Sequence, residues 1–361
     1  MSNQAVGTVY QTIIDEVINT SRVDFEESGV EESVLEELRQ FRSSWSVDPK
    51  TGVYSGIPSP TGIQGDPALT SYGIVQSKEM GQHLMTLDPK VDKVYSSPFY
   101  RCLQTMTPFM ELQQQKAQAA ARSPQTPPAS GDASGPANGE SLLPSAPAPA
   151  PAPAHVHAPV TKMLPEHGIR EWFGSAPFDH PEPAAPRVLK NMFPSYDQEY
   201  VSVVTPSKRG ETLEQLQDRI TKALRGIIEQ CDADGSRAVV LCSHAAVIIM
   251  IGRILTGQFP ARVDMDDFKA YTCGLSVYGR SDCKDCEDGK DATAGDSFDH
   301  GCRCPPSESD TVANLMGGWI CHLNSDCSFL SGGPERGWKF SGDESFPDTG
   351  SLSEADAASK L

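Results

Sequence analysis

The 361-residue chain carries 48 acidic and 30 basic side chains, which gives a formal net charge of -18. This balance argues against a large nucleic-acid-binding face, so protein or small-molecule partners are expected and no direct contact with nucleic acid. No apolar run approaches the roughly 20 residues that cross a bilayer, and residues 1–15 lack the pattern of a signal peptide. We therefore expect a soluble intracellular protein, no membrane partner, and reduced thiols at its ten cysteines.

The chain begins with an acidic segment and a first predicted helix. Residues 1–40 are polar and acidic and contain no convincing strand. A Gly-rich loop at 52–66 precedes residues 69–87, where apolar and small side chains recur at helical spacing. Thr70 or Ser71 is suited to cap this helix at its N-terminus.

A strand, a turn and a second helix follow. The short β-type run at 91–95 ends in Ser-Ser-Pro, and helical periodicity resumes over 100–112. Residues 113–156 consist almost entirely of Ala, Pro, Gly, Ser and Gln and include the repeat APAPAPAPA. Such a composition cannot bury enough apolar surface to order itself, so we predict a disordered insertion within a domain.

Strands and helices alternate again in the second half of the chain. An amphipathic helix over 212–230 leads into an apolar strand at 237–242, and a further helix is expected from Ala245. Other strands are expected at 157–163, 273–278 and 318–323. This order implies an α/β fold with a mostly parallel central sheet, helices on both faces, and a small C-terminal β extension.

The predicted boundaries divide the chain into five segments. They are an atypical acidic N-terminus at 1–40, a main domain at 41–281 with the disordered insertion 113–156, a cysteine-rich acidic loop at 282–310, the C-terminal β extension at 311–345, and a disordered tail at 346–361.

Four cysteines in the acidic loop have a spacing related to that of zinc sites. Cys283, Cys286, Cys302 and Cys304 follow the pattern C-x-x-C, fifteen residues, C-x-C. Four thiolates can hold zinc tetrahedrally, but the second pair is tighter than the usual C-x-x-C. The alternative, a variable loop without metal, is the expected one, so the cofactor prediction is none.

His244 lies where an apolar strand meets the next helix, in VVLCSHAAVIIMI. Many buried histidines are simply hydrogen-bonded within a core. In open α/β sheets, however, ligands bind outside the carboxyl ends of the strands, often at a helix N-terminus that favours anions. His244 is therefore a candidate phosphate ligand.

Two further side chains are candidates for the same anion site. Arg101 follows the strand end in SSPFYRCLQT, and its planar guanidinium can hold a phosphate through two hydrogen bonds. Glu171 in GIREW can protonate a leaving oxygen if burial or a bound anion raises its pKa. The alternatives are a surface salt-bridge partner for Arg101 and an ordinary surface glutamate for Glu171.

The motifs SSPFYRCLQT, GIREW, GETLEQLQDRI and VVLCSHAAVI, in this order, resemble those of the histidine phosphatase superfamily, also called the phosphoglycerate mutase family. In that family the first motif supplies a phosphate-binding Arg, and S-H-[GA] supplies a phosphate-binding His. The general acid Glu lies between them. The resemblance implies a phosphoglycerate mutase-like fold, phosphate binding by Arg101 and His244, and Glu171 as the acid.

The nucleophile of that family is absent. It should come from Arg-His-Gly at the end of an early strand, and the sequence contains no Arg-His-Gly. FRSSW resembles the continuation after that motif, which leaves Leu38, Arg39 and Gln40 in its three places, and none can attack phosphorus in line. Two explanations stay open, a pseudoenzyme or a first strand lost through a wrongly predicted exon boundary. Either way, we expect the central sheet to lack an early strand.

A narrower resemblance is carried by SSPFYRCLQTMTPF, NMFPSYDQEYVSVVTPSKRGET and GGWICHLNSDCSFLSGGPERGWKF. Together they look like the fungal histidine-phosphatase-like subunits of the RNA polymerase III transcription factor TFIIIC. In such subunits the C-terminal strands bind another TFIIIC subunit. The resemblance thus implies a protein interface within 319–340, with Trp319, Phe329 and Trp338 as candidate anchors, although three aromatic residues also suit a small core.

These observations predict a nuclear TFIIIC-type subunit, also present in the cytoplasm, that acts through protein–protein interaction. Its phosphatase activity is predicted to be weak or lost, and whether it is an enzyme stays open. A phosphorylated small molecule or peptide is a candidate ligand. The alternative is an active phosphomonoesterase whose first strand and motif are missing from this sequence.

Overall fold

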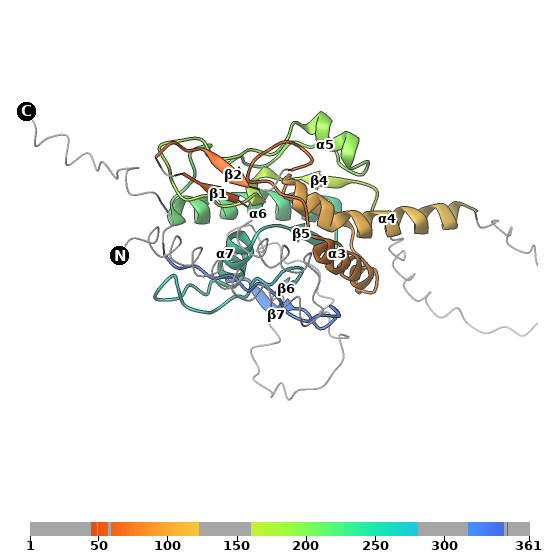
Figure 1. Cartoon of the computed structure of the whole chain (residues 1–361). Coiled ribbons are helices and arrows are strands. Elements are labelled where there is room, and N and C mark those ends of the chain that lie inside the picture. The colour runs from red at the N-terminus through yellow and green to blue at the C-terminus, as the bar shows by residue number, and fades with distance from the viewer. Residues whose placement is uncertain are drawn as a thin grey trace, which may run out of the picture.

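The computed structural model describes residues 45–48, 50–56, 59–122, 160–280, 317–342 and 345 (Figure 1). The predicted acidic N-terminus, residues 123–156 of the predicted insertion, the cysteine-rich loop with its four candidate zinc ligands, and the predicted tail lie outside the described residues. Among the helices of the described ranges, none is long and apolar enough to cross a membrane.

Three short parallel strands form the centre of the fold. β3 (Lys93–Ser96) lies between β4 (Met163–Pro165) and β5 (Val239–Cys242). The register places Val94 opposite both Met163 and Val240. Because all three strands run in the same direction, their carboxyl ends meet at one edge of the sheet.

Helices cover both faces of this sheet. Val94 packs in a core cluster with side chains of α3 (Ser71–Leu84) and α4 (Tyr100–Arg122). The next residue, Tyr95, packs in a second cluster with α6 (Leu213–Asp234) and α7 (Ala245–Thr256). Successive side chains of a strand point to opposite faces, so the two clusters lie on opposite sides of the sheet. The predicted α/β class is confirmed.

Local sequence accounts for the ends of these helices. The side chain of Thr70 accepts a hydrogen bond from the backbone of Gly73 at 3.0 Å, which caps α3. Thr212 and Gln215 form a reciprocal capping box at the start of α6. α4 continues to Arg122, past the expected start of the insertion at 113, because its Gln, Lys and Ala residues are strong helix formers.

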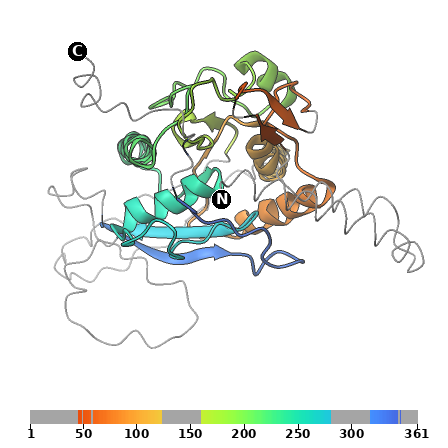
Figure 2. The same ribbon diagram turned by 60° about the vertical axis from the view of Figure 1, so that its left-hand side comes forward.

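A second, two-stranded sheet contains the C-terminal region of the fold. β6 (Leu275–Arg280) pairs antiparallel with β7 (Trp319–Asp326), and α7 packs against this pair (Figure 2). The predicted C-terminal extension is thus joined to the main domain through β6. Within the described residues, β5 pairs only with β3 and does not join β6. Whether an early strand joins the sheet concerns residues before 45, which lie outside the described residues.

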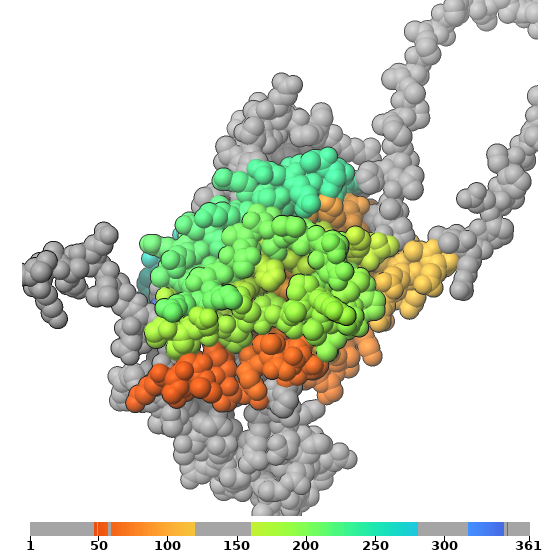
Figure 3. All heavy atoms as spheres, turned by 90° about the horizontal axis from the view of Figure 1, so that it is seen from above, coloured from red at the N-terminus to blue at the C-terminus, as the bar shows by residue number. Residues whose placement is uncertain are grey.

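The remaining described elements are an N-terminal hairpin and the segment that follows β4. β1 (Trp45–Val47) and β2 (Tyr54–Gly56) form an antiparallel hairpin. The segment after β4 contains a 3-10 turn (His167–Ile169) and α5 (Pro186–Met192). In Figure 3 the first described segment, in orange and red, lies along the green segment that follows β4, in agreement with a 2.5 Å hydrogen bond between Tyr54 and His180.

Candidate active site

The three residues predicted to form the site come together at the carboxyl ends of the parallel strands. Arg101 lies in the first turn of α4 after β3, Glu171 follows the 3-10 turn after β4, and His244 is the N-cap of α7 after β5. Arg101 Nη2 lies 2.7 Å from Glu171 Oε2 and 3.0 Å from His244 Nδ1. His244 Nδ1 lies 3.2 Å from the same carboxylate oxygen. They form one ionic cluster.

Hydrogen bonds between the strand ends fix the positions of these side chains. The backbone N–H of Ser97 donates to the carbonyl of Cys242 at 2.8 Å, which extends the β3–β5 pairing past the last strand residue. The hydroxyl of Ser243 donates to the carbonyl of Ile169 at 2.7 Å. The loop that bears Glu171 is therefore tied directly to the residue before His244.

A buried arginine of α6 holds the same loop from the other side. Arg219 Nη1 donates to the carbonyls of Gly168 and Arg170, at 2.9 and 3.0 Å. Its charge is compensated by Glu211, whose carboxylate accepts from Arg219 Nε at 2.9 and 2.8 Å. Because the backbone on the N-terminal side of Glu171 is anchored in this way, its carboxylate has little freedom to move.

Asp66 is a fourth member of the site, and its only signal in the sequence is its place at the end of a Gly-rich loop. Its carboxylate is fully buried, accepts from the backbone N–H of Tyr100 at 2.9 Å, and lies 3.5 Å from Arg101 Nη1. Burial raises the pKa of Asp66 to about 6, although the Tyr100 N–H and the Arg101 charge oppose this. Asp66 thus caps α4 and orients Arg101.

The charges of the cluster are strongly coupled. Burial favours the neutral form of Glu171, but His244 and Arg101 outweigh it and lower the pKa of this carboxyl to about 2. Burial also disfavours the charged form of His244, but Cys102 and Glu171 outweigh it and raise the pKa of this imidazole to about 9. At neutral pH two cations therefore surround one carboxylate, in the place where an incoming anion would bind.

This charge distribution bears on the acid role expected for Glu171. A general acid must carry a proton at the working pH, and a carboxyl with a pKa of about 2 does not. A phosphate group that displaced the carboxylate from Arg101 and His244 would remove the two cations that lower its pKa and would add negative charge nearby. With such a ligand, protonation of Glu171 would be coupled to ligand binding.

Both nitrogens of the His244 imidazole have partners. Nδ1 faces Arg101 and Glu171, while Nε2 lies 2.7 Å from the hydroxyl oxygen of Ser97. The edge of the ring packs against Phe99, with 5.5 Å between ring centroids. In the region of the chain that the structure describes, no other imidazole contacts Arg101 or Glu171.

An aromatic cavity of about 250 Å³ adjoins the cluster. Glu171 contributes to its wall, and the ring of His180 stacks on Phe173 with 4.8 Å between centroids. The other aromatic lining residues are Tyr54, Trp172 and Trp338. The site can thus receive a flat or apolar group beside the anion position.

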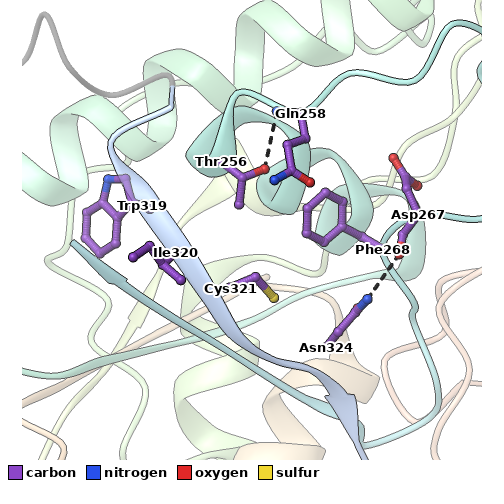
Figure 4. A pocket seen from close by; sticks show the side chains of 8 residues that line it. All are labelled: Thr256, Gln258, Asp267, Phe268, Trp319, Ile320, Cys321 and Asn324. Carbon is purple, nitrogen blue, oxygen red and sulfur yellow. Dashed lines mark hydrogen bonds between the residues drawn. The ribbon is translucent and has the colours of Figure 1, made fainter. Parts of the chain in front are cut away.

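The three aromatic residues predicted as partner anchors do not form one patch. Trp319 and Trp338 pack against the core cluster of α6 and α7, and Phe329 stacks on His83 of α3 with 4.2 Å between centroids. All three are half-buried. Trp319 also lines an open pocket of about 410 Å³ along β7, on the side away from β6 (Figure 4).

The family model described as "Transcription factor IIA, alpha/beta subunit" matches residues 9–232. The range includes residues 9–44 and the Ala/Pro-rich insertion, and it ends inside α6, before β5 and His244. The matched range therefore does not coincide with the part of the chain that forms the site. The large subunit of transcription initiation factor IIA from Schizosaccharomyces pombe is 32% identical over 133 residues, which are 35% of this chain and 34% of that protein.

Two other relatives are a transcription factor subunit and a phosphatase. The transcription factor tau 55 kDa subunit of Saccharomyces cerevisiae is 27% identical over 312 residues, or 83% of this chain. The ecdysteroid-phosphate phosphatase of Drosophila melanogaster is 45% identical over 53 residues, or 15% of this chain. The chain spans 56% of the length of the first relative and 7% of the second.

A solved structure is also similar. It is the ecdysone phosphate phosphatase from Bombix mori in complex with tungstate, with a TM-score of 0.35 and 19% identity over 57% of this chain and 62% of that one. The motifs that form the site resemble those of the histidine phosphatase superfamily, and by the sequence match over residues 9–232 the chain belongs to the transcription factor IIA alpha/beta family.

Proposed function

We propose that this chain is a nuclear, TFIIIC-type subunit that acts through protein–protein contacts, and that its phosphatase-like site binds an anion but turns over phosphate esters weakly or not at all. The observation that carries the proposal is the similarity to the tau 55 kDa subunit, which extends over 83% of the chain. The similarity to the phosphatase is confined to 53 residues.

The chemistry of the site supports the second half of the proposal. Covalent catalysis in this superfamily needs an imidazole nucleophile from Arg-His-Gly, and the sequence has no such motif. His244 cannot replace it, because both ring nitrogens are engaged and it stands beside Arg101 as a ligand would. What remains is a preorganised pair of cations, suited to a phosphorylated small molecule or peptide.

The pocket along β7 is the partner surface that we propose (Figure 4). Ile320 is 52% exposed at its rim, and Phe268 and Trp319 supply apolar walls. A partner side chain that entered the pocket would cover Ile320 together with Trp319, and tryptophan is enriched in hot spots. Other TFIIIC subunits are the partners expected here.

Affinity purification of the tagged full chain at physiological salt tests this role. Other TFIIIC subunits should be recovered with the wild type and lost with Ile320→Asp. Val201→Asp is the matched control, since Val201 is 84% exposed and lies outside the pocket. If the wild type recovers no TFIIIC subunit, the proposal is wrong. If Ile320→Asp recovers as much TFIIIC as the wild type, the interface lies outside this pocket.

The alternative of an active phosphomonoesterase rests on the intact cluster of Arg101, Glu171 and His244. Turnover of a generic phosphate ester is expected at background, with no change in His244→Ala. Turnover that this substitution abolishes would establish the alternative.

A second candidate role, in an assembly of the TFIIA type, is favoured by the match over residues 9–232 and by the Schizosaccharomyces pombe relative. Residues 9–44 of that match precede the described fold. Deletion of residues 1–44 should abolish recovery of TFIIA subunits while leaving TFIIIC subunits in place, if this role holds.

A further inference from the structure

Two cysteines lie directly beneath the anion cluster and have no role in the proposed function. Cys102 follows Arg101 in the first turn of α4, and Cys242 is the last residue of β5, two positions before His244. The thiol of Cys242 donates to the carbonyl oxygen of Cys102 at 3.5 Å, and the thiol of Cys102 lies 3.7 Å from the carbonyl oxygen of Ser243. Each thiol therefore lies against the backbone at or next to the other cysteine, at the contact between α4 and β5.

The surroundings of the two thiols differ. Cys102 Sγ lies 3.6 Å from His244 Nε2 and next to the Arg101 charge. The hydrogen bond from Cys242, together with these cations, outweighs burial and lowers the pKa of Cys102. The same hydrogen bond and burial raise the pKa of Cys242. The surroundings thus favour the thiolate form at Cys102 and the thiol form at Cys242.

We propose that Cys102 and Cys242 form a redox-active pair, which a hydroperoxide such as hydrogen peroxide converts into a disulfide. In the first step the Cys102 thiolate attacks one peroxide oxygen, the O–O bond breaks, and sulfenic acid and hydroxide form. In the second step the Cys242 sulfur attacks the sulfenic sulfur, the S–O bond breaks, and water leaves with the Cys242 proton. The thiolate and the thiol together lose two electrons, and the peroxide is reduced to one water and one hydroxide, which takes a proton from solvent to become a second water.

This pairing suits the position of the cysteines in the fold. A disulfide needs cysteines that already lie in contact, and Cys242 Sγ lies 3.5 Å from the backbone carbonyl oxygen of Cys102. Cys102 is 4% exposed, but Arg101 and Glu171 above it are each about one-fifth exposed, so a small oxidant has a short path. Transient redox-sensing disulfides are the kind that reducing compartments contain.

The test uses the full chain, treated with hydrogen peroxide, then denatured in N-ethylmaleimide and digested with trypsin. Cys102 and Cys242 fall in the separate peptides 102–116 and 238–253, each with a single cysteine. Mass spectrometry should find these two peptides linked, two hydrogens lighter than their sum, with a matching loss of maleimide labelling at both. Reduction with dithiothreitol should restore the labelling.

Variants and a control complete the experiment. In Cys242→Ser, dimedone should trap Cys102 as sulfenic acid, because the resolving thiol is gone. Cys231→Ser is the control, since Cys231 is a buried thiol on α6 near Tyr95, and it should leave the link unchanged. Full maleimide labelling of Cys102 after peroxide, or a link from Cys102 to the nearby Cys273, would overturn the proposal. The wild-type result stands even if a variant fails to fold.

Discussion

Replacement of Glu171 by Gln removes the negative charge that touches both Arg101 and His244. The pKa of this carboxyl is depressed from its ordinary 4.5 to about 2, which corresponds to about 3 kcal/mol of favourable interaction at neutral pH. The variant keeps the shape of the side chain but leaves two cations in contact at 3.0 Å. We therefore expect a loss of about 2–3 kcal/mol in the free energy of unfolding at pH 7.

An added anion should restore the stability that Glu171→Gln removes. Phosphate that binds only the folded state adds about 2.7 kcal/mol at a concentration one hundred times its dissociation constant. In wild type the Glu171 carboxylate competes for the same two cations, so phosphate should stabilise it much less. The expected pattern is a destabilised variant in phosphate-free buffer whose midpoint of thermal unfolding rises steeply with phosphate.

Thermal and urea unfolding with a phosphate titration measure this directly. Glu111→Gln is the matched control, because Glu111 is an exposed residue of α4 away from the cluster. The pH dependence gives a second check. Because the pKa of the Glu171 carboxyl is depressed in the folded state, its charge stabilises the fold above about pH 4.5. The free energies of unfolding of wild type and variant should therefore converge as the pH falls towards 2. Equal stability of Glu171→Gln and Glu111→Gln, or equal phosphate stabilisation of wild type and Glu171→Gln, would refute the reasoning.

Three further predictions concern the surroundings of the cluster. Glu211→Gln leaves the buried Arg219 charge unpaired and should cost about 3–5 kcal/mol in urea unfolding, whereas a cost below about 1 kcal/mol would mean that Arg219 is compensated elsewhere. Gly210→Ala puts a Cβ 2.2 Å from a backbone carbonyl oxygen at a φ of +78° and should destabilise by more than about 2 kcal/mol, measured by thermal unfolding. The pKa of His244 is raised in the folded state, so its protonated imidazole stabilises the fold fully below pH 6.5. This contribution is lost as the pH rises through 9. Wild type should therefore lose stability over this window in urea titrations, and His244→Gln should not.

The positions of the main site residues were predictable from the sequence for a physical reason. Arg101 and His244 each follow a predicted strand, and the carboxyl ends of parallel strands meet at one edge of a sheet. The periodic pattern of apolar residues in a strand or helix therefore marks where such a residue lies in the sequence. Glu171 was placed in the site by the resemblance of its GIREW motif. Asp66 could not be found in this way, because it enters the site from a loop without periodicity, through backbone geometry that only the folded chain defines.

The lack of a sequence signal in loops also explains why the three predicted partner anchors do not share one surface. Trp319, Phe329 and Trp338 are close in sequence and were expected to share one surface. The chain turns sharply between them, so that Phe329 packs on α3 while Trp338 lines the cavity beside Glu171. Three aromatic residues within a short segment predict burial well, but the direction in which each one points depends on turns that have no strong sequence signal.

Hydrogen bonds between the ends of the three described parallel strands position the proposed anion ligands relative to one another. Glu166 N–H donates to Ser96 O at 2.9 Å and Ser97 N–H to Cys242 O at 2.8 Å, so β4, β3 and β5 are joined beyond their last paired residues. The segments that carry Arg101, Glu171 and His244 are extensions of these same strands. Their mutual geometry is therefore set by contacts among β4, β3 and β5, whereas a nucleophile has to be supplied by a fourth segment. If the chain lacks catalysis but binds an anion, as we propose, the contacts that position the anion ligands do not depend on the segment that would supply a nucleophile.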